Sequence, residues 1–276
     1  MIACYRNRGS TPHFLYKMQK LYEIPLLYDI AFRRPAVGYH VDGLIECHRR
    51  FRKDYQLERI LELAAGPGRH SLEFAARNYK SAALDYAADM CRYASALAKQ
   101  NSVPLDVYQA NMRDFAIPHK YDLAMILLNS IGHLYTDDDL LKHLFAVWRH
   151  LNVNGLYVIE AHFPPWTNRD SLHAASWLLE MQELQMRVDF GRSDDQFDQD
   201  MHIRKVFVHI VGQLRGEPVD FQDYLTIRSW SGEALEHVIR ESAAFEIVCK
   251  LGELNPDTEF KEHDAQRLVY VLRRLD

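Results

Sequence analysis

The chain has 276 residues, of which 48% are hydrophobic and 26% charged, and its formal net charge is −5 at pH 7. These proportions are ordinary for a globular protein, and the length is sufficient to bury a core. The negative net charge argues against nucleic acid as a partner, because such binding depends on a positive field. The longest apolar run, 123–128, is far too short to span a bilayer. We therefore expect neither a nucleic-acid nor a membrane partner.

The four cysteines are far apart in the sequence and form no closely spaced pair. This spacing predicts neither a disulfide framework nor a zinc site, and reduced thiols are the simplest interpretation. Residues 1–19 are rich in basic side chains and lack the apolar segment of a signal peptide. We therefore expect a cytoplasmic protein.

From Leu57 onward, short apolar runs alternate with longer amphipathic stretches, which is typical of parallel strands joined by crossover helices. The fourth run is almost entirely apolar, as expected for a central strand covered on both faces. Gly155 is expected to supply the left-handed turn that ends the third helix. In chain order, the predicted strands are 59–64, 81–85, 105–110, 121–128 and 156–161, and the predicted helices between them are 69–78, 89–100 and 137–151.

The alternation ends at Pro164-Pro165. Three candidate strands follow without helices between them, at 183–190, 202–214 and 219–230. The turn at 216–218 is too short for a crossover, so antiparallel hairpins are predicted here. A helix at 231–241 and strands at 245–251 and 267–272 complete the chain.

A glycine-rich turn follows the first predicted strand, in the sequence Glu62-Leu-Ala-Ala-Gly-Pro-Gly. Gly66 permits a backbone conformation that a Cβ would penalise, and Gly68 allows a ligand to approach the main chain closely. Asp85 ends the second strand 17 residues beyond Gly68, where a carboxylate can bind both hydroxyls of a ribose. Ser71 stands where a dinucleotide-binding fingerprint would have its third glycine. These residues predict a site for a nucleoside cofactor without identifying it.

In the order and spacing of its motifs, the stretch 60–161 resembles the core of the class I S-adenosylmethionine-dependent methyltransferases. The segments that carry the resemblance are 62–68, 85–90, 111–115, 121–134 and 151–156, and the tail at 228–231 and 267–270 is similar to the small-molecule branch of that family. The resemblance implies an α/β fold with a doubly wound, seven-stranded Rossmann-like sheet formed by 57–164 and 231–276. It also implies a helical lid at 1–56 and an antiparallel β cap at 165–230, similar to that of sugar-amine and amino-acid N-methyltransferases.

The resemblance places S-adenosylmethionine at the carboxyl ends of the strands. The residues that it assigns to the cofactor are Glu62, Ala64, Gly66, Gly68, Arg69, Asp85, Tyr86, Met90, Asn111, Met112, Leu128, Asn129 and His133, with Tyr28 and Arg34 from the lid.

Several of these assignments have structural alternatives. Glu62 can instead be a buried acid tied to main-chain amides, Asp85 an ordinary strand-end acid and Met90 a core residue. Arg33 is as able as Arg34 to pair with the methionyl carboxylate. The family often has aspartate at the position of Asn111, where the amide oxygen can still accept a hydrogen from the adenine amino group.

For the transfer itself, the candidates are His133, His162 and Tyr135, with Glu160 as a further possibility, because they lie at or just beyond the ends of the fourth and fifth strands. The cofactor carries an activated methyl group, so the enzyme mainly orients the reactants and excludes water. A neutral amine needs little further help, whereas a hydroxyl usually needs a base or a metal. Because the sequence shows no clear acidic cluster, we predict no metal. Since an amine acceptor needs none, we favour a small-molecule amine over a hydroxyl compound.

Two other classes of function remain open. A nicotinamide-dependent oxidoreductase shares the glycine turn and the ribose acid, although it would have a third glycine at position 71. A non-catalytic protein with a degenerate methyltransferase fold is also compatible with Asn111 and with the lack of an obvious base. The cap in addition offers a surface for a homodimer.

Overall fold

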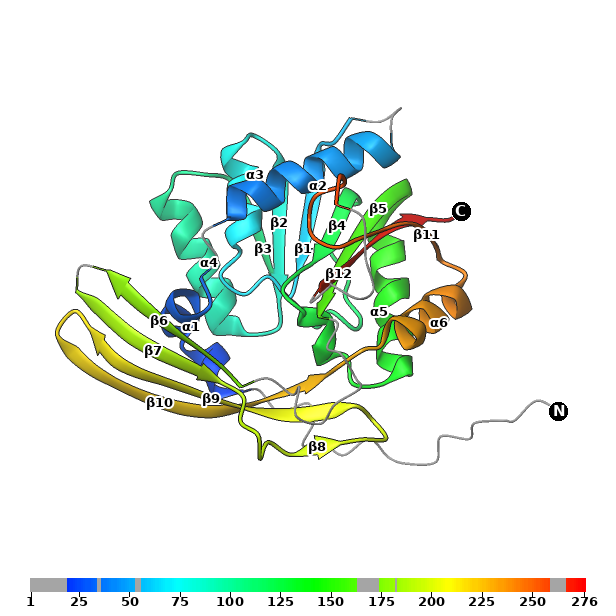
Figure 1. Ribbon diagram of the computed structural model, residues 1–276. Helices are drawn as coiled ribbons and strands as arrows, with labels where there is room; N and C mark the ends of the chain where they lie inside the picture. Colours follow the sequence, from blue (N-terminus) through cyan, green and yellow to red (C-terminus); the bar gives the residue numbers. More distant parts are fainter. Residues whose placement is uncertain (1–18, 34–35, 53–55, 163–173, 182, 259–266) are drawn as a thin grey trace.

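The computed structural model describes residues 19–33, 36–52, 56–162, 174–181, 183–258 and 267–276. Within them the chain forms one seven-stranded sheet flanked by helices and a second, antiparallel sheet that lies beside it (Figure 1). The short helix α1 (Pro25–Ala31) lies between the two sheets in this view. The predicted combination of an α/β core with an antiparallel insertion is confirmed.

The large sheet has the strand order β11-β12-β5-β4-β1-β2-β3. β1 to β5 run parallel, and β12 is antiparallel to both of its neighbours. Because the order reverses between β1 and β4, the carboxyl ends of these strands diverge into a crevice, where open α/β sheets bind ligands. The strands are β1 (Arg59–Leu63), β2 (Lys80–Asp85), β3 (Leu105–Gln109), β4 (Tyr121–Ile126), β5 (Leu151–His162), β11 (Phe245–Leu251) and β12 (Arg267–Arg274).

Helices cover both faces of this sheet, as the nearly continuous apolar strands require. On one face Ile60 and Leu123 pack against α2 (Val37–Phe51) and α3 (Arg69–Ala76). On the other, Leu61 packs in a cluster with α5 (Asp137–His150) and α6 (Gly232–Ser242). α4 (Ala88–Gln100) packs on β2 and β3. None of the helices in the described ranges is both long and apolar enough to cross a membrane.

The junction between α5 and β5 differs from the predicted one. α5 ends at His150 and β5 begins at once with Leu151, whereas the sequence predicted a strand from 156. The left-handed residue is Asn154, with φ 60°, and not Gly155. The pairing shifts from Tyr121 with Leu151 to Leu123 with Leu156, so 152–155 bulge out of the strand. A Cβ at position 155 would lie 2.7 Å from the Asn152 carbonyl oxygen, so Gly155 allows a close approach within the bulge.

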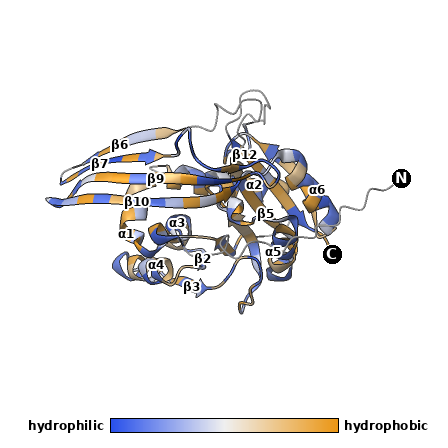
Figure 2. Cartoon of the chain, turned by 90° about the horizontal axis from the view of Figure 1, so that it is seen from below, coloured by the Kyte–Doolittle hydropathy of each residue, from blue (hydrophilic) through white to orange (hydrophobic). Residues whose placement is uncertain are grey.

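The second sheet is antiparallel and has the order β10-β9-β7-β6, with β8 paired to β9. Hydrophobic and polar residues largely alternate along β10 (Figure 2), as expected for a strand with one buried face, whereas β9 has consecutive apolar residues at 206–208 and 210–211. The predicted strands correspond to β7, β9 and β10, but β6 was missed. Its central run Trp177-Leu178-Leu179 hides the alternation, since only Leu178 is well exposed. The strands are β6 (Ala175–Met181), β7 (Leu184–Phe190), β8 (Phe197–Asp198), β9 (Ile203–Leu214) and β10 (Glu217–Arg228).

The N-terminal helices divide between the two sheets. η2 (Lys20–Glu23) and α1 bury Leu21, Leu27 and Ala31 against the inner face of the second sheet. The Leu21 backbone N–H donates to Asp223 of β10, and the Trp177 indole donates to the Ala31 carbonyl oxygen. α2, by contrast, packs on the large sheet. η2 and α1 therefore form one packed unit with the cap.

A close approach at Gly43 of α2 generates a testable prediction. A Cβ at this position would lie 1.7 Å from the Leu254 carbonyl oxygen, so Gly43→Ala must displace α2 or the turn after β11. We expect the free energy of unfolding, measured by urea denaturation, to fall by about 1–3 kcal/mol. Gly38→Ala in the first turn of the same helix is the control, because its Cβ would meet nothing closer than 3.5 Å. It should leave stability unchanged or raise it by about 0.5 kcal/mol, and equal losses for both variants would contradict the packing argument.

Candidate functional site

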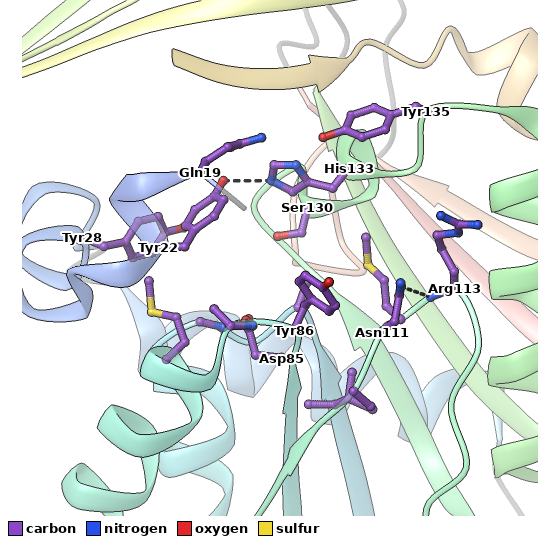
Figure 3. Close-up of a pocket in the computed structure, with 17 residues that line it drawn as sticks. Gln19, Tyr22, Tyr28, Asp85, Tyr86, Asn111, Arg113, Ser130, His133 and Tyr135 are labelled. Atoms are coloured by element: carbon purple, nitrogen blue, oxygen red, sulfur yellow. Dashed lines mark hydrogen bonds between the residues drawn. The ribbon is translucent and has the colours of Figure 1, made fainter. Parts of the chain in front are cut away.

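A cavity lies at the carboxyl ends of β1 and β2, under η2 and α1 (Figure 3). Gln19, Tyr22 and Tyr28 border it from the N-terminal side, facing Asp85 and Asn111 at the sheet. The structure thus brings together predicted residues from five separate segments. The predicted cofactor residues that line this cavity are Tyr28, Ala64, Gly66, Asp85, Tyr86, Met90, Asn111, Met112 and His133.

A second cavity continues from the first along the end of β1. The two share Tyr28, Ala64 and Ser130 as lining residues. The second cavity is also lined by Glu62, Arg69 and Leu128, which the sequence assigned to the cofactor, and by Arg33. Together the two cavities form one elongated site. Arg34 lies outside the described residues.

The turn between β1 and α3 has three residues in the left-handed region: Ala64 (φ 49°), Gly66 (φ 53°) and Gly68 (φ 67°). Ala64 and Gly66 line the first cavity. Gly68 lines neither cavity. A Cβ there would meet Ala83 and Ala94 at the ordinary contact distance of 3.5 Å, so it is the positive φ that favours glycine at this position. Gly68 thus adopts the left-handed conformation from which α3 begins, and its contact with a ligand stays a prediction.

The Asp85 carboxylate is fixed by two backbone amides. It accepts hydrogen bonds from the N–H of Gly66 at 2.7 Å and from that of Ala87 at 2.8 Å. Burial raises the pKa of Asp85, and these hydrogen bonds oppose the rise. The backbone amide of Tyr86 also interacts with this carboxylate. Because a carboxylate has about four acceptor positions, it retains acceptor capacity for a ligand in the first cavity. Asp85 is thus both a strand-end acid that holds the glycine turn and a preoriented acceptor.

Glu62 is buried and holds the start of α3. Its carboxylate accepts hydrogen bonds from the Ser71 backbone N–H at 2.9 Å and from the Ser71 hydroxyl at 2.6 Å, and His70 Nδ1 lies 3.3 Å away. An acid at this position also complements the positive end of the helix. The alternative of an acid tied to main-chain amides therefore applies, although Glu62 also lines the second cavity.

Arg69 connects the core to α1. Its guanidinium forms a bidentate ion pair with Asp29, with Nε 2.8 Å from Oδ1, and the Tyr93 hydroxyl donates to Oδ2 of the same carboxylate at 2.9 Å. Asp29 is 5% exposed. The charge of Arg69 is thus largely satisfied within the protein. Sequence reasoning missed Asp29, because nothing local marks it.

The adenine side of the site, as assigned by the resemblance, combines a loop with a core residue. The Asn111 side-chain oxygen accepts the Arg113 backbone N–H at 3.0 Å, which orients the amide at the edge of the cavity. Met90 is 1% exposed and lines the cavity, so it is at once a core residue and a candidate contact. Tyr86 beside it is 55% exposed. Asn129 precedes η3 (Ser130–His133) and lines neither cavity.

Among the catalytic candidates, His133 lies in the first cavity with its Nε2 2.9 Å from the Tyr22 hydroxyl (Figure 3). Burial lowers the pKa of His133 to about 4, partly opposed by a hydrogen bond to the backbone of Thr226. Burial raises the pKa of Tyr22 well above 10. The imidazole is therefore neutral at pH 7 and the phenol protonated. We assign the imidazole proton to Nδ1, which leaves Nε2 to accept the hydrogen bond from Tyr22.

The other two candidates are less directly placed. Tyr135 lines the cavity, but its hydroxyl donates to the Thr226 carbonyl oxygen at 3.2 Å. His162 ends β5, and its side chain lies outside the described part of the chain. Tyr22 was not singled out by the sequence. Its place in an N-terminal segment rich in aromatic residues was the available signal, and no motif or spacing distinguished it from its neighbours.

The sequence has recognisable relatives. Residues 60–155 match the model of a methyltransferase domain. The chain is 27% identical over 111 residues to dTDP-3-amino-3,4,6-trideoxy-alpha-D-glucopyranose N,N-dimethyltransferase of Streptomyces venezuelae, covering 40% of this chain and 45% of that protein. It is 26% identical over 144 residues to dTDP-3-amino-3,6-dideoxy-alpha-D-glucopyranose N,N-dimethyltransferase of Streptomyces fradiae, covering 52% and 53%. The matched stretch thus spans about half the length of these curated relatives.

The fold is also found among solved structures. The crystal structure of an S-adenosylmethionine-dependent methyltransferase from Clostridium acetobutylicum ATCC 824 superposes with a TM-score of 0.76, at 16% identity, covering 92% of this chain and 98% of that one. Because the superposition covers 92% of this chain, the structural similarity extends beyond the residues 60–155 that match the methyltransferase domain. The chain thus contains a region, 60–155, that matches a methyltransferase domain, is similar in sequence to two amino-sugar dimethyltransferases, and shares the fold of an S-adenosylmethionine-dependent methyltransferase.

Proposed function

We propose that this protein transfers a methyl group from S-adenosylmethionine to the amino group of a small molecule. The observation that carries the proposal is the elongated site itself. It has the glycine turn and Asp85 toward one end and a neutral histidine, His133, facing the Tyr22 hydroxyl in the same cavity. Both dimethyltransferases to which the chain is similar are named for amino-sugar substrates, which supports an amine as the acceptor.

The residues of the site fit the parts of S-adenosylmethionine. The free acceptor positions of Asp85 suit the ribose hydroxyls, and Tyr86, Met90 and Asn111 provide apolar surface and a polar edge for adenine. In the second cavity Arg33 is placed to pair with the methionyl carboxylate. When bound, the cofactor supplies a methyl group that is already activated by its positively charged sulfur.

His133 is proposed to bind and orient the neutral form of the acceptor amine. An amine that arrives protonated has no lone pair for attack, so it must lose a proton first. Because the pKa of His133 is lowered to about 4, its Nε2 is a weak base and does not take up that proton. We propose that the amine binds in its neutral form and that Nε2 accepts a hydrogen bond from its N–H once the acceptor displaces the Tyr22 hydroxyl. Tyr22 and Tyr135 border the same space and are proposed to orient the acceptor and exclude water.

Asp85→Asn tests the cofactor assignment. An amide replaces one acceptor by a donor, so it cannot serve both backbone amides and also bind a ribose. We expect the Kd for S-adenosylmethionine, measured by isothermal titration, to rise at least about tenfold. Asp89→Asn is the control, because Asp89 lies in the first turn of α4 and pairs with exposed Arg92. Its affinity should match wild type, and an unchanged Kd in Asp85→Asn would contradict the assignment.

The same titration, together with an assay of turnover on amino compounds, separates the competing functions. Binding of NAD in place of S-adenosylmethionine would favour the oxidoreductase. Binding of S-adenosylmethionine and S-adenosylhomocysteine without turnover on any amine would favour a non-catalytic protein. Turnover on amino compounds, with S-adenosylhomocysteine as the product, is the result expected from the proposal.

His133→Ala tests the proposed contact between His133 and the acceptor amine. We expect kcat to fall about 100-fold or more, while the Kd for S-adenosylmethionine stays near the wild-type value. Because the pKa of His133 is lowered to about 4, the ring remains neutral above about pH 5, and the kcat/KM profile should show no histidine titration between pH 5.5 and 8. His237→Ala is the control, since that side chain is 70% exposed on α6. Unchanged turnover in His133→Ala would remove His133 from the mechanism.

A further inference from the structure

The loop that follows β4 is held in an unfavourable backbone conformation. Leu128 and Asn129 are consecutive and both left-handed, with φ values of 57° and 62°. Residues with a Cβ adopt this region at a cost, which is greater for leucine than for asparagine. Such strain persists only where the surrounding structure imposes it. The loop leads directly into η3, which presents Ser130 and His133 to the site.

Glu160 of β5 supplies the restraint on one side of this loop. It is 1% exposed, and its Oε2 accepts the Leu128 backbone N–H at 2.8 Å. Its Oε1 accepts a hydrogen bond from Arg267 Nη1 of β12 at 3.0 Å. Ile126, the last paired residue of β4, lies opposite Ile159, so Glu160 stands beside the point where the loop begins. Glu160 lines neither cavity, which argues against the direct contact with the acceptor that the sequence left open.

β10 restrains the loop on the other side. A Cβ on Gly132 would lie 2.7 Å from Ile227 Cγ2 and 2.8 Å from the Arg228 carbonyl oxygen, so η3 packs directly on that strand. The segment that carries His133 is therefore held by contacts with β5 on one side and with β10 on the other. Of the two restraints, only the one at β5 acts on a strained residue through a charged group.

We propose that Glu160, oriented by Arg267, is a positioning residue that keeps Leu128 in its left-handed conformation and thereby sets the places of Ser130 and His133. The carboxylate acts through the backbone and touches neither the cofactor nor the acceptor. The kinetic part of this inference rests on the proposed methyltransferase function, whereas its conformational part does not.

Hydrogen exchange on the ligand-free protein tests the conformational part. Glu160→Ala removes both hydrogen bonds, and Glu160→Gln must lose one of them, because an amide offers one acceptor to two donors. We expect amide exchange in 128–133 to accelerate at least about tenfold in Glu160→Ala and less in Glu160→Gln. Should Glu160→Ala fail to fold, the acceleration in Glu160→Gln decides. Unchanged exchange in this segment would overturn the proposal.

Asp122→Asn is the matched control for that experiment. Asp122 is a buried carboxylate at the opposite end of the sheet, where it accepts the backbone N–H groups of Glu58 and Arg59, each at 3.0 Å, and pairs with Arg52. Its replacement should lower Tm without altering exchange in 128–133 selectively. If it accelerates that segment as much as Glu160→Ala does, the effect is general destabilisation and the proposal fails.

A double-mutant cycle with Leu128→Gly tests whether Glu160 acts through the strained residue. Glycine adopts positive φ without a steric penalty, so the restraint should matter less when position 128 is glycine. We expect Glu160→Ala to raise the Kd for S-adenosylhomocysteine about tenfold in the wild-type background, and by less than about threefold in the Leu128→Gly background. Equal effects in both backgrounds would overturn the mechanism. If the wild-type protein binds neither S-adenosylmethionine nor S-adenosylhomocysteine, the proposed function fails, and the exchange experiment alone decides the inference.

Discussion

The organisation of the site depends on one buried carboxylate, that of Asp29. α1 and η2 pack on the cap through a shared hydrophobic cluster, and Asp29 joins this unit to the core through Arg69 and the Tyr93 hydroxyl. Arg69 is also the first residue of α3, directly after the glycine turn. The Asp29–Arg69 ion pair therefore joins α1, on one side of the cavity, to the residue that follows the glycine turn on the other side. A buried ion pair of this kind is costly to break from one side, since the remaining charge loses its partner.

The ionisable groups within the site are kept neutral or firmly hydrogen-bonded. Burial keeps the His133 imidazole neutral at pH 7 and the Tyr22 phenol protonated. Asp85 opposes its own burial with two backbone amides. At His133, a positively charged cofactor and a basic acceptor would thus meet a neutral imidazole, which adds no positive charge. This arrangement favours the neutral form of an amine, which is the form that can attack.

Much of the fold could be predicted from the sequence, because its signals are local. Alternating apolar runs located the parallel strands, and the pair of Gly66 and Asp85 located the crevice. The contacts of Asp29 and Tyr22 could not be predicted in this way, since their partners lie 40 and 111 positions away along the chain. β6 was not predicted for a different reason: its consecutive apolar residues obscured the alternation of polar and apolar side chains that marks a strand with one buried face. At Asn154-Gly155 the sequence predicted a left-handed Gly155, whereas Asn154 adopts the positive φ and Gly155 allows a close approach of the backbone.

The packing of η2 and α1 on the cap has a consequence for how such proteins can diversify. Residues 20–31 and 175–228 are separated by the whole parallel part of the sheet, yet they share one hydrophobic cluster that reaches Tyr22 and Tyr28. Remodelling the cap therefore also changes the support of Tyr22 and Tyr28, which border the first cavity. A cap transplanted from a relative would need its own N-terminal segment with it. The unit that would have to be exchanged therefore consists of two segments that are far apart in the sequence.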